Sequence, residues 1–247
     1  VIFTGQVSTP LIGNDAFQEV DIIGITRPCT KHNFLVKDVK DLAETVRKAF
    51  YLARSGRPGP VLVDIPKNIQ QASCEFVWPE DVVMRSYCPT FRANLNQLRR
   101  AMDVLVTSRK PLIVAGGGVI MANAAEELCT LAHLMHAPVC STLMGLGAFP
   151  GDDPLWIGML GMHGTFAANR AVTQADVILA VGARFDDRVT GKLSQFAPNA
   201  RIVHIDIDPT TLRKNVRVEV PVVSDALSAL QGLRSILESG HAQKDWA

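Results

Sequence analysis

Short, almost continuously apolar runs alternate with helix-like stretches from residue 92 to residue 240, and this alternation strongly limits the possible folds. An unbroken apolar run is typical of a strand that is buried on both faces of a sheet. Strands that alternate with helices predict a parallel, doubly wound α/β sheet. The predicted strands are 111–118, 138–142, 176–183, 201–208 and 220–225, and the predicted helices are 94–108, 123–137, 164–175 and 226–237, with a further short helix after 208.

Residues 1–68 have the pattern of part of another α/β layer. One helical face is predicted from the spacing of Leu42, Val46, Ala49, Phe50 and Ala53, and Gly56 ends that helix. The other predicted elements are strands at 1–3 and 60–66, a short helical piece at 15–20 and an irregular stretch at 25–36. Residues 69–91 lack periodicity and are predicted to be a linker to a domain at 92–240. Because the sequence starts with Val1 in an apparent strand, we expect a fragment of a longer protein.

The composition excludes several classes of function. The formal charge of +1, from 25 basic and 24 acidic residues, gives no general attraction to nucleic acid or to an anionic membrane. No apolar run approaches the roughly 20 residues of a membrane span, and no signal-peptide pattern is present. The five cysteines form no C-x-x-C pair, so we expect free thiols in a reducing compartment and neither a disulfide framework nor a zinc site.

Glycines and charged side chains follow the predicted strands of the 92–240 domain. Ligands of doubly wound sheets bind at the carboxyl ends of the strands, so these residues are candidates for a binding site. They are Gly116, Gly117 and Gly118, then Gly161, Met162, His163 and Gly164, then Arg184, Asp186, Asp187 and Arg188, and finally Asp206, Asp208 and Asp225. Lys192 is interpreted as solvated surface. Because several such strand ends meet at one edge, we predict a ligand that contains a nucleotide.

Each of these features also has a structural interpretation. A glycine cluster outside a G-x-G-x-x-G pattern is as typical of a tight turn as of a binding loop. Single aspartates after strands are often helix N-caps, and Asp208 before Pro209 fits that description. A lone histidine such as His163 is more often structural than catalytic, and Met162 taken alone suggests core packing.

Several segments together identify a family. The stretches "TGQV…IGNDAFQEV", "TKHNFLV", "SGRPGPVLVDIPK", "LGMHG" and "VGARFDDRVTGK" closely resemble the catalytic large subunit of acetohydroxyacid synthase, also called acetolactate synthase, a thiamine-diphosphate enzyme. The resemblance implies the carboxyl half of a thiamine-pyrimidine-binding α/β domain at 1–68 and a doubly wound FAD-binding middle domain at 92–240. Residues 241–247 would begin a linker to a third domain.

The resemblance also implies a reaction and its cofactors. The enzyme joins a two-carbon unit from pyruvate to a second 2-oxo acid, pyruvate or 2-oxobutyrate, and releases carbon dioxide in branched-chain amino acid synthesis. FAD would bind without a net redox role. Thiamine diphosphate and Mg²⁺ would have their main ligands outside this chain, because the activating glutamate would precede residue 1 and no "GDG" segment occurs. We therefore expect the chain alone to bind FAD but to be inactive.

Specific positions acquire roles from the resemblance. Arg188 would engage the carboxylate of the second oxo acid, which suits a bidentate guanidinium. Phe17 and Gln18 would line the approach to the active site, with Lys67 at the channel mouth and Met162 beside the flavin. The cofactor-binding positions would be Arg57, Gly116, Gly117, Gly118, Thr142, Leu143, Gly161, Met162, His163, Gly164, Gly182, Arg184, Asp186, Arg188, Asp206, Ile207 and Asp225. Where many family members have proline after "GQV", this chain has Ser8, which puts sensitivity to sulfonylurea inhibitors in doubt.

The expected partners are 2-oxo acid substrates, a second copy of the chain in a homodimer or larger assembly, and a regulatory small subunit, with no nucleic acid or membrane. The expected location is the cytoplasm, or a plastid or mitochondrion in a eukaryote. Two other interpretations stay open. One is another thiamine-diphosphate decarboxylase or carboligase with an ADP- or FAD-binding middle domain, which would not need Arg188. The other is a nucleotide-binding module without chemistry.

Overall fold

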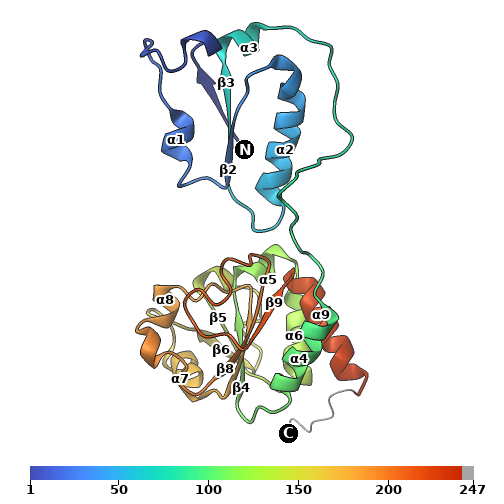
Figure 1. Ribbon diagram of the computed structural model, residues 1–247. Helices are drawn as coiled ribbons and strands as arrows, with labels where there is room; N and C mark the ends of the chain where they lie inside the picture. Colours follow the sequence, from blue (N-terminus) through green and yellow to red (C-terminus); the bar gives the residue numbers. More distant parts are fainter. Residues whose placement is uncertain (241–247) are drawn as a thin grey trace. The chain divides into compact units, whose positions relative to one another are not determined.

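The computed structural model describes residues 1–240, which divide into two compact units, Val1–Pro89 and the part of the chain from Thr90 onward (Figure 1). The linker predicted to begin at 241–247 lies outside the described residues. No helix of the described part is long and apolar enough to cross a membrane.

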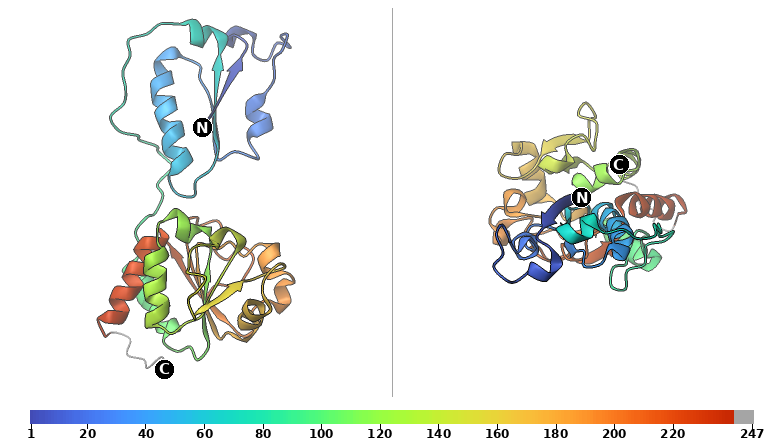
Figure 2. Two further views of the ribbon diagram at one scale, coloured as in Figure 1. Left: turned by 180° about the vertical axis from the view of Figure 1, so that it is seen from behind. Right: turned by 90° about the horizontal axis from the view of Figure 1, so that it is seen from above.

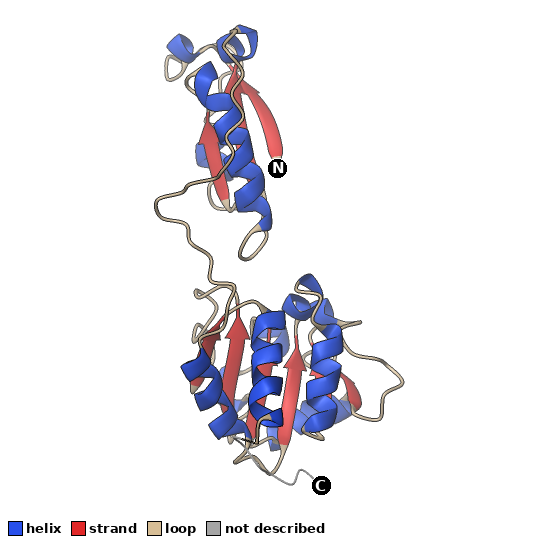
Figure 3. Ribbon diagram, turned by 90° about the vertical axis from the view of Figure 1, so that its right-hand side faces the viewer, coloured by secondary structure: helices blue, strands red, loops and turns tan. Residues whose placement is uncertain are grey.

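The first unit is built on a three-stranded parallel sheet in the order β1-β3-β2. The strands are β1 (Ile2–Gln6), β2 (His32–Leu35) and β3 (Val61–Pro66), and the helices are α1 (Ile22–Thr26), α2 (Leu42–Arg54) and α3 (Lys67–Gln71), with 3-10 turns at Thr9–Leu11 and Val39–Asp41. The central strand β3 is almost entirely buried. Helix α2 packs beside the sheet (Figure 3) and contributes Ala49 and Leu52 to the core. Phe50, predicted on its buried face, is 53% exposed.

Two local predictions for this unit are wrong. Residues 15–20 form turns instead of a helix, because Asp15 and Gln18 adopt left-handed backbone angles (φ of 54° and 63°) that cannot continue a helix. The Glu19 carboxylate accepts hydrogen bonds from the backbone N–H groups of Gly13 and Ala16 and holds these turns. The stretch 25–36, predicted to be irregular, contains β2, which pairs with one side of β3.

The segment that follows α3 has neither helix nor strand from 72 to 94. It is nonetheless attached to the first unit by Tyr87, which packs against that core. The Tyr87 hydroxyl donates to the carbonyl oxygen of Ser55 at 2.9 Å and accepts from Lys31 Nζ at 2.8 Å. The end of α2 and this segment are therefore joined by one polar cluster.

The second unit is a six-stranded parallel sheet in the order β6-β5-β4-β7-β8-β9. The strands are β4 (Pro111–Ala115), β5 (Val139–Ser141), β6 (Trp156–Met159), β7 (Val177–Val181), β8 (Arg201–Asp206) and β9 (Val220–Val223). The chain builds the sheet outward from β4 on one side and then returns to add β7, β8 and β9 on the other. The order therefore reverses between β4 and β7, and this reversal is the topological switch point of a doubly wound fold.

Helices cover both faces of this sheet (Figures 1 and 2). The helices are α4 (Leu95–Leu105), α5 (Gly117–Met121), α6 (Ala125–Leu134), α7 (Phe166–Gln174), α8 (Asp187–Thr190) and α9 (Ala226–Glu238), with 3-10 turns at Leu143–Gly145 and Leu193–Gln195. Alternate strand residues supply the two cores: Ile113 packs with α4, α6 and α9 on one face, and Leu112 packs with α7 on the other. The predicted doubly wound α/β class is confirmed.

One strand of this unit was not predicted, and one predicted helix does not form. Residues 156–159, for which the sequence predicted no element, form the edge strand β6, and the predicted short helix after 208 is a series of turns. The first predicted strand ends at Ala115 because Gly117 and Gly118 already belong to α5.

Candidate functional site

The candidate site is the carboxyl edge of the six-stranded sheet, and its switch point is closed by glycines. The backbone N–H of Gly116 donates to the Val181 carbonyl at 2.9 Å, and that of Gly118 donates to the Gly182 carbonyl at 3.2 Å. Gly182 has a left-handed φ of 59°, and a Cβ there would lie 2.5 Å from the Cα of Gly118. Glycine at these positions therefore lets the backbone segments that follow β4 and β7 pack against each other. This packing is sufficient to account for the glycines without a bound ligand.

A second backbone contact brings Met162 to Arg188. The N–H of Met162 donates to the carbonyl oxygen of Arg188 at 2.8 Å. Gly161, with a φ of 97°, makes the approach possible, because a Cβ there would overlap that same carbonyl oxygen. The Arg188 Nη1 lies 3.7 Å from the Met162 sulfur. Both side chains are largely exposed, at 69% for Arg188 and 62% for Met162.

The charged segment after β7 is anchored by one buried aromatic residue. Phe185 is only 1% exposed, has a left-handed φ of 51°, and packs edge-on against Phe196 and His204. Asp186 caps α8 by accepting from the N–H of Val189 at 3.2 Å. The buried ring and the cap fix the backbone on both sides of Phe185, so that the neighbouring arginines lie at the surface.

The two arginines of this segment have only weak acidic partners. Arg184 lies 3.5 Å from Asp186, and Arg188 lies 3.8 Å from Asp187, with all four side chains at least 41% exposed. Exposed pairs of this kind contribute about 0–1 kcal/mol to stability. The guanidinium groups are therefore available to an anionic ligand at little energetic cost.

A buried histidine, which sequence reasoning did not single out, supports the same segment. His204 on β8 is fully buried, and its Nε2 lies 2.7 Å from the carbonyl oxygen of Ala183. Burial lowers the pKa of His204 to about 4, so the ring is neutral at pH 7 and Nε2 carries the proton that it donates to Ala183. Among the described residues, its Nδ1 has no hydrogen-bond partner. The sequence signal was a polar residue inside the apolar run "RIVHID".

The aspartates at the strand ends have structural partners of their own. Asp225 caps α9 by accepting from the N–H groups of Leu227 and Ser228. Asp206 is 7% exposed and accepts from the N–H of Asp208 at 2.8 Å. Asp208 accepts from the N–H and hydroxyl of Thr210. Asp225 is therefore a helix N-cap. Asp206 is instead a buried carboxylate at the carboxyl edge, and the next residue, Ile207, is partly buried.

Large apolar side chains are exposed in the loops that follow β5 and β6. Thr142 begins the loop after β5, its N–H donating to the Ala115 carbonyl at 3.0 Å, and the next two residues, Leu143 and Met144, are 69% and 67% exposed. With Met162 after β6, they follow two neighbouring strands of one sheet edge. His163 and Gly164 complete the turn after β6, and the Gly164 N–H donates to the Gly161 carbonyl.

The remaining candidates belong to the first unit. Phe17 is 88% exposed, and Gln18 lies next to it in the turns after β1. Lys67 is the first residue of α3, directly after β3, the strand that pairs with β1. The carboxyl ends of these two strands thus bring both loops to one edge, where the Thr9 N–H donates to Asn68. Arg57 is exposed after α2, and its carbonyl accepts from Lys31.

A parallel sheet of this order, with glycines at its switch point and charged groups on its carboxyl edge, defines the class of doubly wound α/β domains, whose ligands bind at that edge. Within that class the chain belongs to the thiamine pyrophosphate enzymes: the family described as "Thiamine pyrophosphate enzyme, central domain" matches residues 98–233. The resemblance noted in the sequence is confirmed at this level.

The chain is also similar to acetolactate synthase large subunits. It is 49% identical over 249 residues to the isozyme 3 large subunit of Escherichia coli, which covers 99% of this chain and 43% of that protein. It is 47% identical to the large subunit of Buchnera aphidicola from Schizaphis graminum, over 100% of this chain and 44% of the relative. A probable large subunit from Methanocaldococcus jannaschii is 50% identical over 96% of this chain and 41% of that relative. The chain thus spans less than half the length of these relatives.

Proposed function

We propose that this protein is the catalytic large subunit of an acetolactate synthase and that its second unit binds FAD at the carboxyl edge of the six-stranded sheet. The proposal rests on one observation: a backbone hydrogen bond joins Met162 to Arg188 at that edge, and the side chains of both residues are exposed. The near-50% identity to acetolactate synthase large subunits over almost the whole chain supports it.

The residues at this edge fit the chemistry of FAD. Exposed Leu143, Met144 and Met162 offer an apolar surface suited to a flat isoalloxazine ring. Arg184, whose contact with Asp186 is long and exposed, offers cationic donors for a diphosphate. Asp206, buried at the end of β8, is an acceptor of the kind that nucleotide sites use for ribose hydroxyls. Apolar, cationic and anionic groups therefore occur in the combination that the three parts of FAD require.

In the proposed reaction, a two-carbon unit from pyruvate is joined to a second 2-oxo acid, pyruvate or 2-oxobutyrate, with release of carbon dioxide. Thiamine diphosphate, held with Mg²⁺, would supply the covalent chemistry when bound. Arg188 would bind the carboxylate of the second 2-oxo acid with its guanidinium, since its contact with Asp187 is too long and exposed to occupy it. Phe17, Gln18 and Lys67 would line the approach of substrate.

The proposed partners follow from the same assignment. The subunit would act as a homodimer or larger assembly, and a regulatory small subunit would bind it. The relatives in Escherichia coli and Buchnera are themselves named large subunits.

The test of FAD binding is the absorption spectrum of the purified protein. We expect visible flavin absorption, and chromatography of the nucleotide released on denaturation should identify FAD. Arg184→Gln should weaken FAD binding, whereas Arg109→Gln, at an exposed arginine before β4 on the opposite edge, should not. A colourless protein that releases ADP or NAD would contradict the FAD assignment and favour a different thiamine-diphosphate enzyme or a nucleotide-binding module.

The test of the reaction is the formation of acetolactate from pyruvate by the full-length protein with thiamine diphosphate, Mg²⁺ and FAD. Acetaldehyde as the main product would instead indicate a simple decarboxylase.

A further inference from the structure

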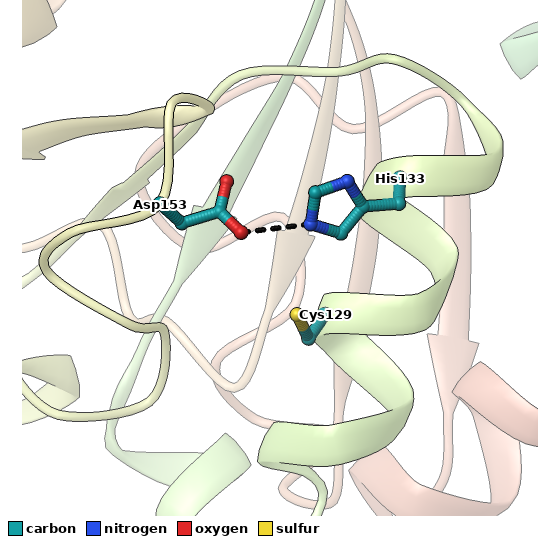
Figure 4. Close-up of side chains that lie close together, drawn as sticks. All are labelled: Cys129, His133 and Asp153. Atoms are coloured by element: carbon teal, nitrogen blue, oxygen red, sulfur yellow. Dashed lines mark hydrogen bonds and ion pairs between the residues drawn. The ribbon is translucent and has the colours of Figure 1, made fainter.

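Three side chains of different chemistry converge at the amino edge of the six-stranded sheet (Figure 4). The Sγ of Cys129, a ring nitrogen of His133 and a carboxylate oxygen of Asp153 all lie within 4.8 Å of one another. The His133 Nε2 is 2.7 Å from the Asp153 Oδ2. A thiol, an imidazole and a carboxylate are the three ligand types that Zn²⁺ accepts in proteins.

The helix and the loop hold these groups in place. Cys129 and His133 are four residues apart on α6, so their side chains lie on the same face of the helix. Asp153 lies in the loop before β6, where its Oδ1 accepts from the Leu155 N–H at 2.9 Å and its carbonyl accepts from the Trp156 N–H at 2.9 Å. The carboxylate is thus fixed by its own loop and faces the helix (Figure 4).

The carboxylate of the cluster would attract a cation, whereas the thiol has to lose its proton before it can bind one. The Leu155 N–H, followed by His133, lowers the pKa of Asp153, so the carboxylate is ionised at neutral pH. Burial, followed by the charge of Asp153, raises the pKa of the Cys129 thiol, which is therefore protonated when no cation is bound. The third group of the cluster, His133, has a side chain that is 50% exposed. A divalent cation would neutralise both the carboxylate and the thiolate.

The cluster is separate from the candidate cofactor site. The end of α6 leads into the amino end of β5, and Asp153 directly precedes the amino end of β6. In a parallel sheet these ends lie at the edge opposite the carboxyl ends, where the glycines and Arg188 are found. A cation at this cluster would therefore join α6 to the loop that precedes the edge strand, far from the carboxyl edge.

We propose that Cys129, His133 and Asp153 form a structural Zn²⁺ site that links α6 to the loop before β6, with water in the fourth position. When zinc binds, the Cys129 thiol releases its proton to solvent and a sulfur–zinc bond forms. The ring proton of His133 moves from Nε2 to Nδ1 by exchange with solvent, and the hydrogen bond between His133 and Asp153 is replaced by their two bonds to the metal. The site is independent of the proposed function. The alternative interpretation is an ion pair between His133 and Asp153 at the surface, next to a cysteine that binds no metal.

The test uses Co²⁺ and Zn²⁺ added to the metal-free purified full-length protein. Co²⁺ should give thiolate-to-cobalt charge-transfer absorption, and Zn²⁺ should abolish it by competition and raise the melting temperature. Cys129→Ser should remove the charge-transfer band. His133→Ala and Asp153→Asn should each weaken Co²⁺ binding by more than about tenfold, the least that loss of a supporting second-shell group costs.

Cys88→Ser, at an exposed cysteine of the first unit, is the matched control and should bind both metals like the wild type. Melting of each variant without metal separates loss of binding from loss of fold. The proposal is wrong if the wild-type protein gives no charge-transfer band, or if Cys129→Ser keeps the wild-type band and affinity.

Discussion

Met162 and Arg188, 26 positions apart, are joined by a backbone hydrogen bond of 2.8 Å and place their side chains together at the carboxyl edge of the sheet. The bond ties the turn after β6 to α8, which Asp186 caps and Phe185 anchors. The position of the Arg188 backbone is therefore set by these three contacts, while its side chain remains exposed.

Arg188→Lys in the full-length protein should shift the products of the proposed reaction. A lysine cannot make the bidentate pair with a carboxylate, and loss of a charged hydrogen bond costs about 1.5–3 kcal/mol. We expect slower acetohydroxyacid formation and weaker preference for 2-oxobutyrate, with pyruvate consumption less affected. Product ratios with pyruvate and 2-oxobutyrate in competition measure this. Lys192→Arg, at an exposed residue of the same segment, is the control. If the variant loses FAD but keeps the wild-type ratio after FAD is resupplied, Arg188 holds the cofactor instead.

Gly182→Ala should destabilise the second unit. The added Cβ would lie 2.5 Å from the Gly118 Cα, and the left-handed φ of 59° is unfavourable for alanine. Overpacking of this kind costs about 1–3 kcal/mol. Denaturant unfolding should show the loss, whereas Gly151→Ala, where a Cβ would meet nothing within 4 Å, should be close to neutral. Equal losses in the two variants would refute a packing role for Gly182.

His204 should make the folded state less stable in acid. Its pKa is lowered from 6.5 to about 4 by burial, so the unfolded state takes up a proton that the folded state excludes. Its contribution to stability is complete above pH 6.5 and is lost as the pH falls toward 4, by about 3 kcal/mol at most. His204→Gln, which keeps a donor for Ala183, should flatten the pH dependence of unfolding in this window, and His136→Asn, at an exposed histidine, should not. Parallel curves for wild type and His204→Gln would contradict the assignment.

Ser8→Pro should be tolerated by the fold and should increase sensitivity to sulfonylurea inhibitors. Ser8 has a φ of −58° and a ψ of 142°, which a proline ring adopts without strain. The ring would add an apolar contact that the hydroxyl cannot make. Inhibition constants of the full-length wild type and variant measure the effect, and unchanged melting shows that the fold is intact. Equal constants would remove Ser8 from the inhibitor site.

The buried strands were predictable from the sequence, whereas two of the four edge strands, β2 and β6, were not. Strands such as β4 and β7 are apolar on both faces because helices cover both, and this pattern is visible without the fold. The two missed strands, β2 and β6, lie at sheet edges. An edge strand buries less surface, so β2 contains His32 and Asn33, and β6 contains Gly158 with a φ of 98°. Neither sequence resembles a core strand.

The sequence by itself determined the α/β class and the placement of glycines and charges after parallel strands, because local periodicity specifies which faces are buried and parallel strands end at one edge. Only the tertiary structure decided which distant residues meet: Gly118 against Gly182, Met162 against Arg188, and Asp153 against His133, 20 positions away. These contacts depend on the order in which strands join the sheet, and hydrophobic periodicity carries no information about that order.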